Sequence, residues 1–254
     1  MKKIVCLFLL IFLASCASRK NFVYLNDVVD SKAVQGSVQE PKIQSDDLLY
    51  ITVSAENPEV AAPYNLKAVA VNGVSGSIES SQNDLESYLV DKNGEIDFPQ
   101  VGKIKVGGLS RLEAVEKIKQ ILADYIQQPV VHIRIINFKI SVLGEVNMPG
   151  THTIRGERIT LLEALSKSGD LTIYGKRKNV TIIREIDGVK TISKVDLTDS
   201  KFIESPYYYL MQNDVVYVEP NNTKIHSSAV GPNLSLGIAI LSATLTAILV
   251  ITRI

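Results

Sequence analysis

Cysteine is scarce in this chain of 254 residues. The two cysteines, Cys6 and Cys16, both lie at the N-terminal end, so the rest of the chain can form neither a disulfide nor a cysteine-ligated metal site. Histidine is almost as rare, and the three histidines, His132, His152 and His226, are far apart in the sequence. His132 falls in an alternating apolar run that is typical of a strand. We therefore expect no metal site and no cofactor.

An excess of charge of one sign is also lacking. Lys plus Arg and Asp plus Glu each number 27, so the chain lacks the basic surplus that nucleic-acid binding usually needs. Glycines in "LGEVNMPG" and "KVGGLS" have neither a dinucleotide-binding nor a Walker context. Five carboxylates are expected at turns or strand edges, where solvated charge is normal: Asp46, Asp47, Asp97, Glu145 and Asp214. The sequence thus predicts neither an enzyme nor a nucleic-acid-binding protein.

The N-terminal end has the organisation of an export signal. Two lysines precede an apolar run over 4–13, which is too short to cross a bilayer core of about 30 Å. The following "LASC" is similar to the bacterial lipobox, in which the cysteine becomes the acylated mature N-terminus. The alternative is an ordinary signal peptide with a chance cysteine. We predict a signal peptide over 1–15 and lipidation of Cys16. The residue after Cys16 is Ala17 and not an acidic residue that would signal retention in the inner membrane. This position therefore favours sorting to the outer membrane.

Residues 16–41 are polar and aperiodic and predict a tether, and a first α+β unit is expected over 42–136. "DLLYITV" and "VVHIRII" read as strands, "NPEVAAPYN" as a loop, and "YLVDKNGEIDFP" as a hairpin with Asn93-Gly94 at its tip. Ser110 and Glu113 form a capping box at the start of a helix. Its apolar stripe is predicted to comprise Leu112, Val115, Ile118, Leu122 and Tyr125.

A second α+β unit is expected over 137–219. "FKISVLGEV" and "THTI" flank an "NMPG" turn, and Thr160 and Glu163 form another capping box on a helix that ends at Gly169. "NVTIIREIDGVKTI" predicts a second hairpin, and "YYYLMQNDVVYVEP" predicts the closing strands. Tyr207, Tyr208 and Tyr209 can stack on sugar rings, although alternate tyrosines of a strand are more typical of core and rim. A polar linker follows over 220–233.

Four stretches resemble a known family: "KIQSDDLLYITVSAENPE", "YLVDKNGEIDFPQVGKIKVGGLSRLEAVEKI", "ISVLGEVNMPGTHTI…ITLLEALSKSGDL" and "LMQNDVVYV". Together they resemble the Wza-type outer-membrane polysaccharide export lipoproteins, with a polysaccharide export domain at 42–136 and an SLBB β-grasp domain at 137–219. Asp46-Asp47 and Asn213-Asp214 stand where the family often has Gly-Asp, and larger members carry further β-grasp units. The resemblance implies non-enzymatic export of capsular or extracellular polysaccharide by a homo-oligomeric ring such as an octamer. It also implies docking on an inner-membrane co-polymerase.

The tail over 234–251 is predicted to be a transmembrane helix, because its eighteen residues extend about 27 Å at about 1.5 Å each. At 100° per residue it has two faces. One face, the small face, carries small residues and is expected either to pack against other helices or to line a lumen. It comprises Ser235, Ala239, Ser242, Ala243, Thr246 and Ala247. The lipid face comprises Leu234, Ile238, Leu241, Leu245, Ile248 and Leu249. Small residues allow close helix contact. The resemblance implies that this helix and its copies from neighbouring subunits form an α-helical barrel through the outer membrane. The alternative is a single membrane anchor.

Two functions therefore remain open. The first is an outer-membrane lipoprotein that forms the export channel, with its soluble domains in the periplasm, and its partners are copies of itself, the co-polymerase, the polysaccharide and membrane lipid. The second is a lipid-anchored periplasmic scaffold or saccharide-binding module without a channel.

Overall fold

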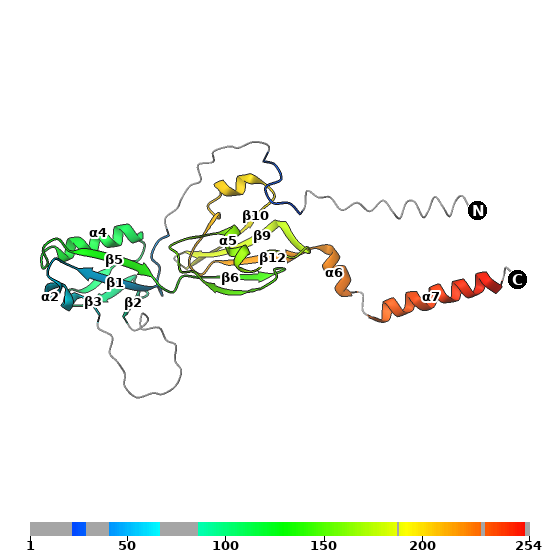
Figure 1. Cartoon of the computed structure of the whole chain (residues 1–254), viewed down its shortest axis with the longest axis horizontal. Coiled ribbons are helices and arrows are strands. Elements are labelled where there is room, and N and C mark those ends of the chain that lie inside the picture. Colours follow the sequence, from blue (N-terminus) through cyan, green and yellow to red (C-terminus); the bar gives the residue numbers. More distant parts are fainter. Residues whose placement is uncertain (1–21, 29–40, 67–85, 187, 230–231, 252–254) are drawn as a thin grey trace, which may run out of the picture.

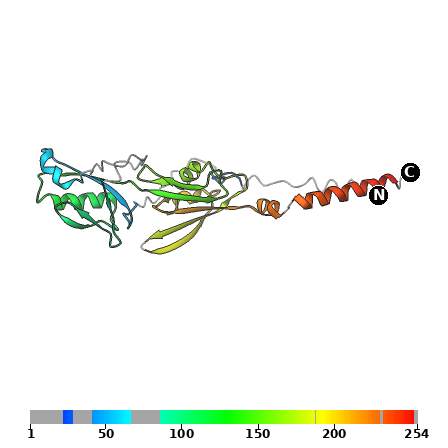
Figure 2. The ribbon, with the colours of Figure 1, turned by 90° about the horizontal axis from the view of Figure 1, so that it is seen from below.

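The protein is a mixed helix-and-sheet molecule of two domains, followed by two helices (Figure 1). The computed structural model describes residues 22–28, 41–66, 86–186, 188–229 and 232–251. The predicted signal peptide over 1–15 and Cys16 lie outside the described residues. The two domains and the last helix follow one another along the long axis of the molecule, with the last helix at the end opposite the first domain (Figures 1 and 2).

The first domain is built on a three-stranded antiparallel sheet in the order β2-β1-β5. These strands are β1 (Leu48–Ser54), β2 (Ser87–Leu89) and β5 (Val130–Ile135). The helix α4 (Arg111–Leu122) packs against this unit, and a two-stranded sheet joins β3 (Glu95–Phe98) to β4 (Gly102–Lys105). The predicted loop after β1 instead contains two short helices, α2 (Pro58–Ala61) and η2 (Ala62–Tyr64).

The predicted hairpin across Asn93-Gly94 is wrong in its pairing. β2 pairs with β1, whereas β3 pairs with β4. Asp91 explains the break between them, because its carboxylate accepts hydrogen bonds from the backbone of Asn93 and Glu95, both at 2.8 Å, and so forms a compact turn. Gly94 has a φ of 75° there, and a Cβ on it would lie 3.0 Å from the Cα of Gly107, so glycine is needed for this close approach.

The capping box of α4 is confirmed, but its buried face differs from the predicted stripe. The Ser110 side chain accepts a hydrogen bond from Glu113 N, and the Glu113 side chain accepts one from Ser110 N. The helix buries Ala114, Ile118 and Leu122, while Leu112 is 53% exposed. Leu112 lies about 120° from Ile118 on the helix wheel, which turns it away from the sheet. Tyr125 is also exposed, because it lies beyond the end of the helix.

The second domain is a five-stranded mixed sheet in the order β10-β9-β12-β6-β7, with α5 (Leu161–Lys167). β12 (Val215–Pro220) runs parallel to β6 (Lys139–Gly144) and antiparallel to β9 (Gly175–Ile186). β6 and β7 (Gly150–Thr153) form one predicted hairpin, and β9 and β10 (Val189–Val195) form the other. The short strands β8 (Ile159–Thr160) and β11 (Tyr209–Leu210) pair, and η3 (Ser200–Glu204) precedes β11.

Each domain has its own hydrophobic core. The first core gathers the inward residues of β1, β5 and α4, and the second gathers those of β6, β9, β12 and α5. Ile135, at the end of β5, packs against both cores. Asn137 joins the domains through hydrogen bonds: its side chain accepts from Leu48 N at 2.9 Å and donates to Asp46 O at 2.8 Å.

Part of the predicted tether is docked on the second domain. Leu25 N donates to Leu197 O at 3.1 Å, and the Tyr24 hydroxyl donates to the Asp170 carboxylate at 2.5 Å. The Arg177 guanidinium lies 5.6 Å from the Tyr24 ring centroid, a cation–π distance. The prediction of a polar tether is wrong for this segment, because five of the seven residues of "FVYLNDV" are apolar or aromatic. We refer to residues 22–28 as the N-terminal strap.

The predicted polar linker contains a helix, α6 (Asn222–Ala229). It is fastened to the second domain, because Asn221 N donates to Tyr174 O at 2.7 Å and Lys224 lies 3.9 Å from the Glu145 carboxylate.

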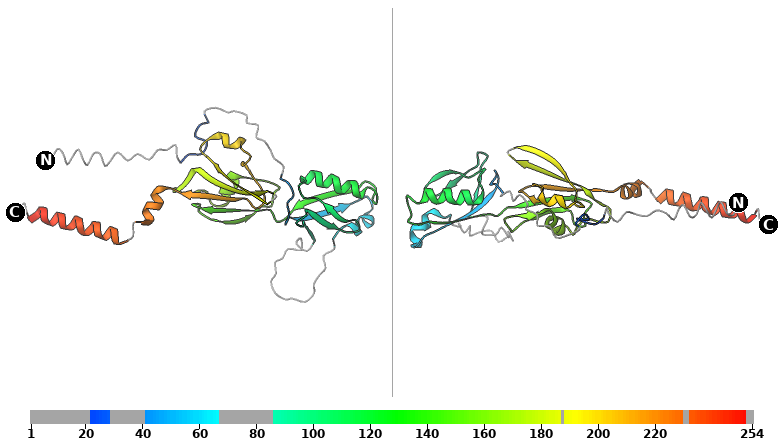
Figure 3. Two further views of the ribbon diagram at one scale, coloured as in Figure 1. Left: turned by 180° about the vertical axis from the view of Figure 1, so that it is seen from behind. Right: turned by 90° about the horizontal axis from the view of Figure 1, so that it is seen from above.

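The last helix, α7 (Pro232–Ile251), projects from the second domain away from the first (Figures 2 and 3). Its described apolar side chains are open to solvent: Leu236, Ile238, Ile240 and Leu241 are 58 to 62% exposed. Within the described part of the chain, no helix is long and apolar enough to cross a membrane. This finding does not support the predicted transmembrane helix over 234–251.

An interdomain cleft as the candidate functional site

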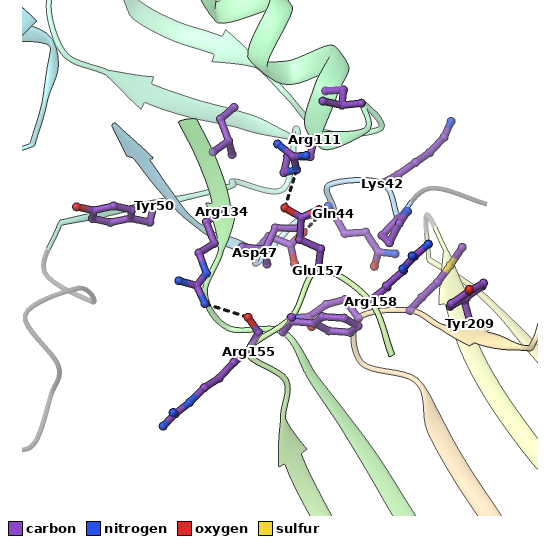
Figure 4. A pocket seen from close by; sticks show the side chains of 18 of the residues that line it. Lys42, Gln44, Asp47, Tyr50, Arg111, Arg134, Arg155, Glu157, Arg158 and Tyr209 are labelled. Atoms are coloured by element: carbon purple, nitrogen blue, oxygen red, sulfur yellow. Dashed lines mark hydrogen bonds and ion pairs between the residues drawn. The ribbon is translucent and has the colours of Figure 1, made fainter. Parts of the chain in front are cut away.

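A cleft of 780 Å³ lies where the two domains meet (Figure 4). That volume is within the range of small-molecule sites, and such sites often form at domain boundaries. Both domains contribute to its walls. We refer to it as the interdomain cleft.

The outer face of the first sheet forms one wall. Strand residues alternate between the two faces of a sheet, so the inward residues Leu49 and Ile51 of β1 enter the core while Tyr50 and Thr52 face outward. On β5, Arg134 stands opposite Tyr50 and His132 stands opposite Thr52, and all four line the cleft. His132 is therefore an exposed strand residue, and the described residues contain no cluster suited to a metal ion.

The second wall comes from the turn between β7 and β8 and from the segment around β11. Glu157 in this turn forms an ion pair with Arg111 of α4 at 3.1 Å, and Arg134 donates to Arg155 O at 2.9 Å (Figure 4). These two contacts cross the domain boundary. They fix the spacing of the walls without filling the space between them.

Two buried aspartates show that the domains repeat one turn. In each domain a residue with positive φ, Asp46 at 69° or Asn213 at 63°, precedes an aspartate that stands immediately before a central strand. Asp47 accepts a hydrogen bond from Gln44 N, and Asp214 accepts one from Met211 N, both at 2.8 Å. The prediction of solvated turn carboxylates is therefore wrong for Asp47 and Asp214, which are 1% and 0% exposed.

The surroundings of the two aspartates differ. Asp214 receives the Arg184 guanidinium at 2.7 Å, whereas Asp47 Oδ1 has no hydrogen-bond partner within the described chain. Burial is the largest effect on Asp47 and raises the pKa of its carboxyl to about 6, with a smaller contribution from Asp46. Since Asp47 lines the cleft, the cleft carries less negative charge in mildly acidic solution than its composition indicates.

Arg184 also fixes the segment that carries Tyr209. Its guanidinium donates to Pro206 O at 3.1 Å and to Tyr209 O at 2.9 Å, and it lies 5.0 Å from the Tyr207 ring centroid. Tyr209 lines the cleft beneath Arg158, whose guanidinium is 5.3 Å from the ring centroid. Tyr208 instead packs against Phe202 at the core. The tyrosine run thus has both core and rim members.

The cleft has a surplus of positive charge. Its acidic members are Asp47 and Glu157, and Glu157 is paired with Arg111. Four further cations line the cleft: Lys42, Arg134, Arg155 and Arg158. Among the residues that the structure describes, no carboxylate oxygen lies within 4.0 Å of these four charged groups.

The small face of α7 is the other candidate surface. Ala239, Ala243 and Ala247 are exposed there, and the hydroxyls of Ser242 and Thr246 donate to Ala239 O and Ser242 O, both at 2.8 Å. Since these hydroxyls are satisfied within the helix, the face needs no water or polar partner. The side chains of five other predicted face residues lie outside the described set: Leu234, Ser235, Leu245, Ile248 and Leu249.

The interdomain cleft was not predicted from the sequence. Its cations come from four separate stretches of the chain, and only the fold brings them together. The one local signal was "RGER" at 155–158, where two arginines flank a turn.

Comparison with known proteins agrees with the two-domain architecture. Residues 35–136 match the family of polysaccharide biosynthesis/export proteins, and residues 138–218 match the SLBB domain. Two curated relatives are the EPS I polysaccharide export outer membrane proteins EpsA of Ralstonia solanacearum and Ralstonia nicotianae.

The first relative is 27% identical over 183 residues, which cover 70% of this chain and 48% of the relative. The second is 29% identical over 147 residues, which cover 56% of this chain and 38% of the relative. The matched region spans less than half the length of both relatives. The order of the two matched domains and the similarity to these relatives show that the chain belongs to the Wza-type family of polysaccharide export proteins.

Proposed function

We propose that this protein carries capsular or extracellular polysaccharide across the outer membrane as a non-enzymatic, lipid-anchored, homo-oligomeric channel. The observation that carries the proposal is the ordered pair of domains, matched to a polysaccharide export domain and an SLBB domain. Both relatives are named as outer-membrane proteins of polysaccharide export, which supports the same membrane and the same class of cargo.

The exposed α7 supports oligomerisation. An apolar helix that projects into water is costly, since each fully buried Leu or Ile side chain contributes about 1.5–3 kcal/mol. In the proposed ring, the small faces of neighbouring α7 helices pack together or line the lumen, and the large faces meet outer-membrane lipid. Small residues permit close packing of this kind, and the internally bonded hydroxyls of Ser242 and Thr246 are compatible with an apolar surrounding.

The N-terminal strap supports a lipid anchor near α7. Tyr24 bonds Asp170, and the same loop carries Tyr174, which bonds Asn221 at the start of α6. Cys16 precedes Phe22 by six residues, a reach of about 20 Å at most. An acyl chain on Cys16 therefore enters the membrane close to where α6 and α7 leave the second domain. The first domain is then on the periplasmic side, where it can meet an inner-membrane co-polymerase.

Imaging of the full chain in mild detergent tests this proposal. We expect closed rings, and we expect a chain that lacks 234–254 to give smaller particles with the same two folded domains. Monomers or dimers of the full chain would contradict the channel and favour a lipid-anchored scaffold or saccharide-binding module.

A further inference from the structure

We propose that the interdomain cleft binds an acidic stretch of the exported polysaccharide, with uronic-acid units as the recognised chemistry. The inference rests on the proposed function, because it names the class of polymer and the residues that hold it. It is carried by the charge, the shape and the exposed aromatic and apolar groups of the cleft.

The cleft carries positive charge that is not neutralised by carboxylates of its walls. Lys42, Arg134 and Arg158 line the cleft from three separate stretches of the chain (Figure 4). The only acidic side chain on the second wall, Glu157, is already paired with Arg111 at 3.1 Å. A cleft that keeps unpaired cations between two walls concentrates anions. Carboxylates suit these cations because guanidinium and ammonium groups form short, charge-assisted hydrogen bonds with them.

The walls of the cleft also present aromatic and apolar groups. Tyr50 and Tyr209 lie on opposite walls and are both half-buried. Leu112 is 53% exposed on the rim, although it belongs to a helix whose other apolar residues mostly pack inward. Flat aromatic and apolar surfaces suit the C–H faces of pyranose rings, while hydroxyls and carboxylates at the ring edge meet Thr52, Gln44 and the cations. A simple inorganic anion would make no favourable contact with these apolar groups.

The size of the cleft also suits a saccharide. The cleft runs between two domains that are joined at Asn137 and across the Arg111–Glu157 pair, and its volume is 780 Å³. It is large enough for a short saccharide segment and is lined by residues of both domains. The site therefore suits a short stretch of the polymer.

Direct binding of a defined saccharide tests the inference. The full chain in detergent is titrated by calorimetry with the hexamer of galacturonic acid, with maltohexaose as the neutral saccharide and with hexaglutamate as a polyanion that has no sugar ring. We expect the galacturonate hexamer to bind at least about tenfold more tightly than either control. Equal affinity for maltohexaose would overturn the acidic specificity, and equal affinity for hexaglutamate would overturn the saccharide specificity.

Matched variants locate the site. Lys42→Gln/Arg158→Gln removes two cleft cations that are exposed, so the fold is retained. Lys119→Gln/Lys190→Gln removes the same charge from exposed residues outside the cleft. We expect the first pair to weaken galacturonate binding at least about tenfold, because each charge-assisted hydrogen bond contributes strongly, and the second pair to leave it unchanged. Equal effects of the two pairs would overturn the assignment.

Surface polymer measured in parallel separates this inference from the proposed function. If the galacturonate hexamer does not bind while the full chain restores export to a deletion strain, the cleft assignment fails and the export function stands. If the hexamer binds in the cleft while the deletion strain exports normally, the cleft assignment stands and the export function fails.

Discussion

The buried pair of Arg184 and Asp214 gives a quantitative prediction for the second domain. The Arg184 side chain is 4% exposed and that of Asp214 is fully buried, with 2.7 Å between the charged groups. Arg184→Met keeps the apolar stem but leaves Asp214 without its cation and removes the bonds to Pro206 O and Tyr209 O. Breaking a buried pair on one side costs about 3–5 kcal/mol. This loss corresponds to roughly 10²- to 10⁴-fold more frequent opening of the domain.

Hydrogen exchange followed by mass spectrometry measures this effect in the full chain. Amides of β9 and β12 report on the second domain, and amides of β1 and β5 are an internal reference. Lys190→Met is the matched control, because Lys190 forms an exposed pair with Glu185 at 3.6 Å on the same β9–β10 hairpin that carries Arg184. Such pairs contribute about 0–1 kcal/mol. If Arg184→Met accelerates exchange in β9 no more than Lys190→Met does, the buried pair does not stabilise this domain as argued.

Three further predictions concern the first domain, the N-terminus and α7. Because burial raises the pKa of Asp47 to about 6, the folded first domain holds a proton there that the unfolded chain releases near pH 4, so the contribution of Asp47 to stability falls as the pH rises from about 4 to about 6. Asp47→Asn should remove this contribution, and thermal melts from pH 4 to 7 in which the variant keeps the pH dependence of the unchanged chain would contradict the assignment. Cys16→Ser should leave an unprocessed precursor, and mass spectrometry that finds the native mature protein without a lipid would contradict lipidation. Leu241→Lys should impair ring assembly and surface polymer more than Ser242→Lys, since a lysine facing lipid costs about 2.5–3.5 kcal/mol, and equal export by the two variants would show that the faces of α7 are assigned wrongly.

The sequence predicted best those features that depend on neighbouring residues. The capping boxes at Ser110 and Thr160 close through hydrogen bonds that span three residues, so they can be read directly from the chain. The β9–β10 hairpin and the β6–β7 hairpin are also local, because each pairs adjacent strands across a short turn.

Features that depend on distant residues were predicted poorly. The pairing of β2 with β1 instead of β3 is decided by backbone contacts between the Asp46–Asp47 turn and Val90. The burial of Asp214 depends on Arg184, thirty positions away in the chain. The N-terminal strap joins Asp27 to Ser200 across an even longer separation. No local pattern encodes such contacts, since each needs the completed sheet.

The interdomain cleft also depends on residues that are distant in the sequence. The cations of the cleft lie in different stretches of the sequence: Lys42, Arg134 and Arg158. Taken alone, each is an ordinary exposed charged residue. Their convergence requires the relative placement of the domains that Asn137 and the Arg111–Glu157 pair maintain. The family resemblance predicted both domains but contained no information about this surface.

Surface polysaccharide in a deletion strain tests the export function most directly. The strain is complemented with the full chain or with a chain that lacks 234–254, and extracted surface polymer is quantified for each at equal protein level. The account predicts that polymer is lost in the deletion strain, restored by the full chain and not restored by the shortened chain. Normal surface polymer in the deletion strain would contradict the export function, and normal polymer with the shortened chain would contradict the role of α7 in the channel.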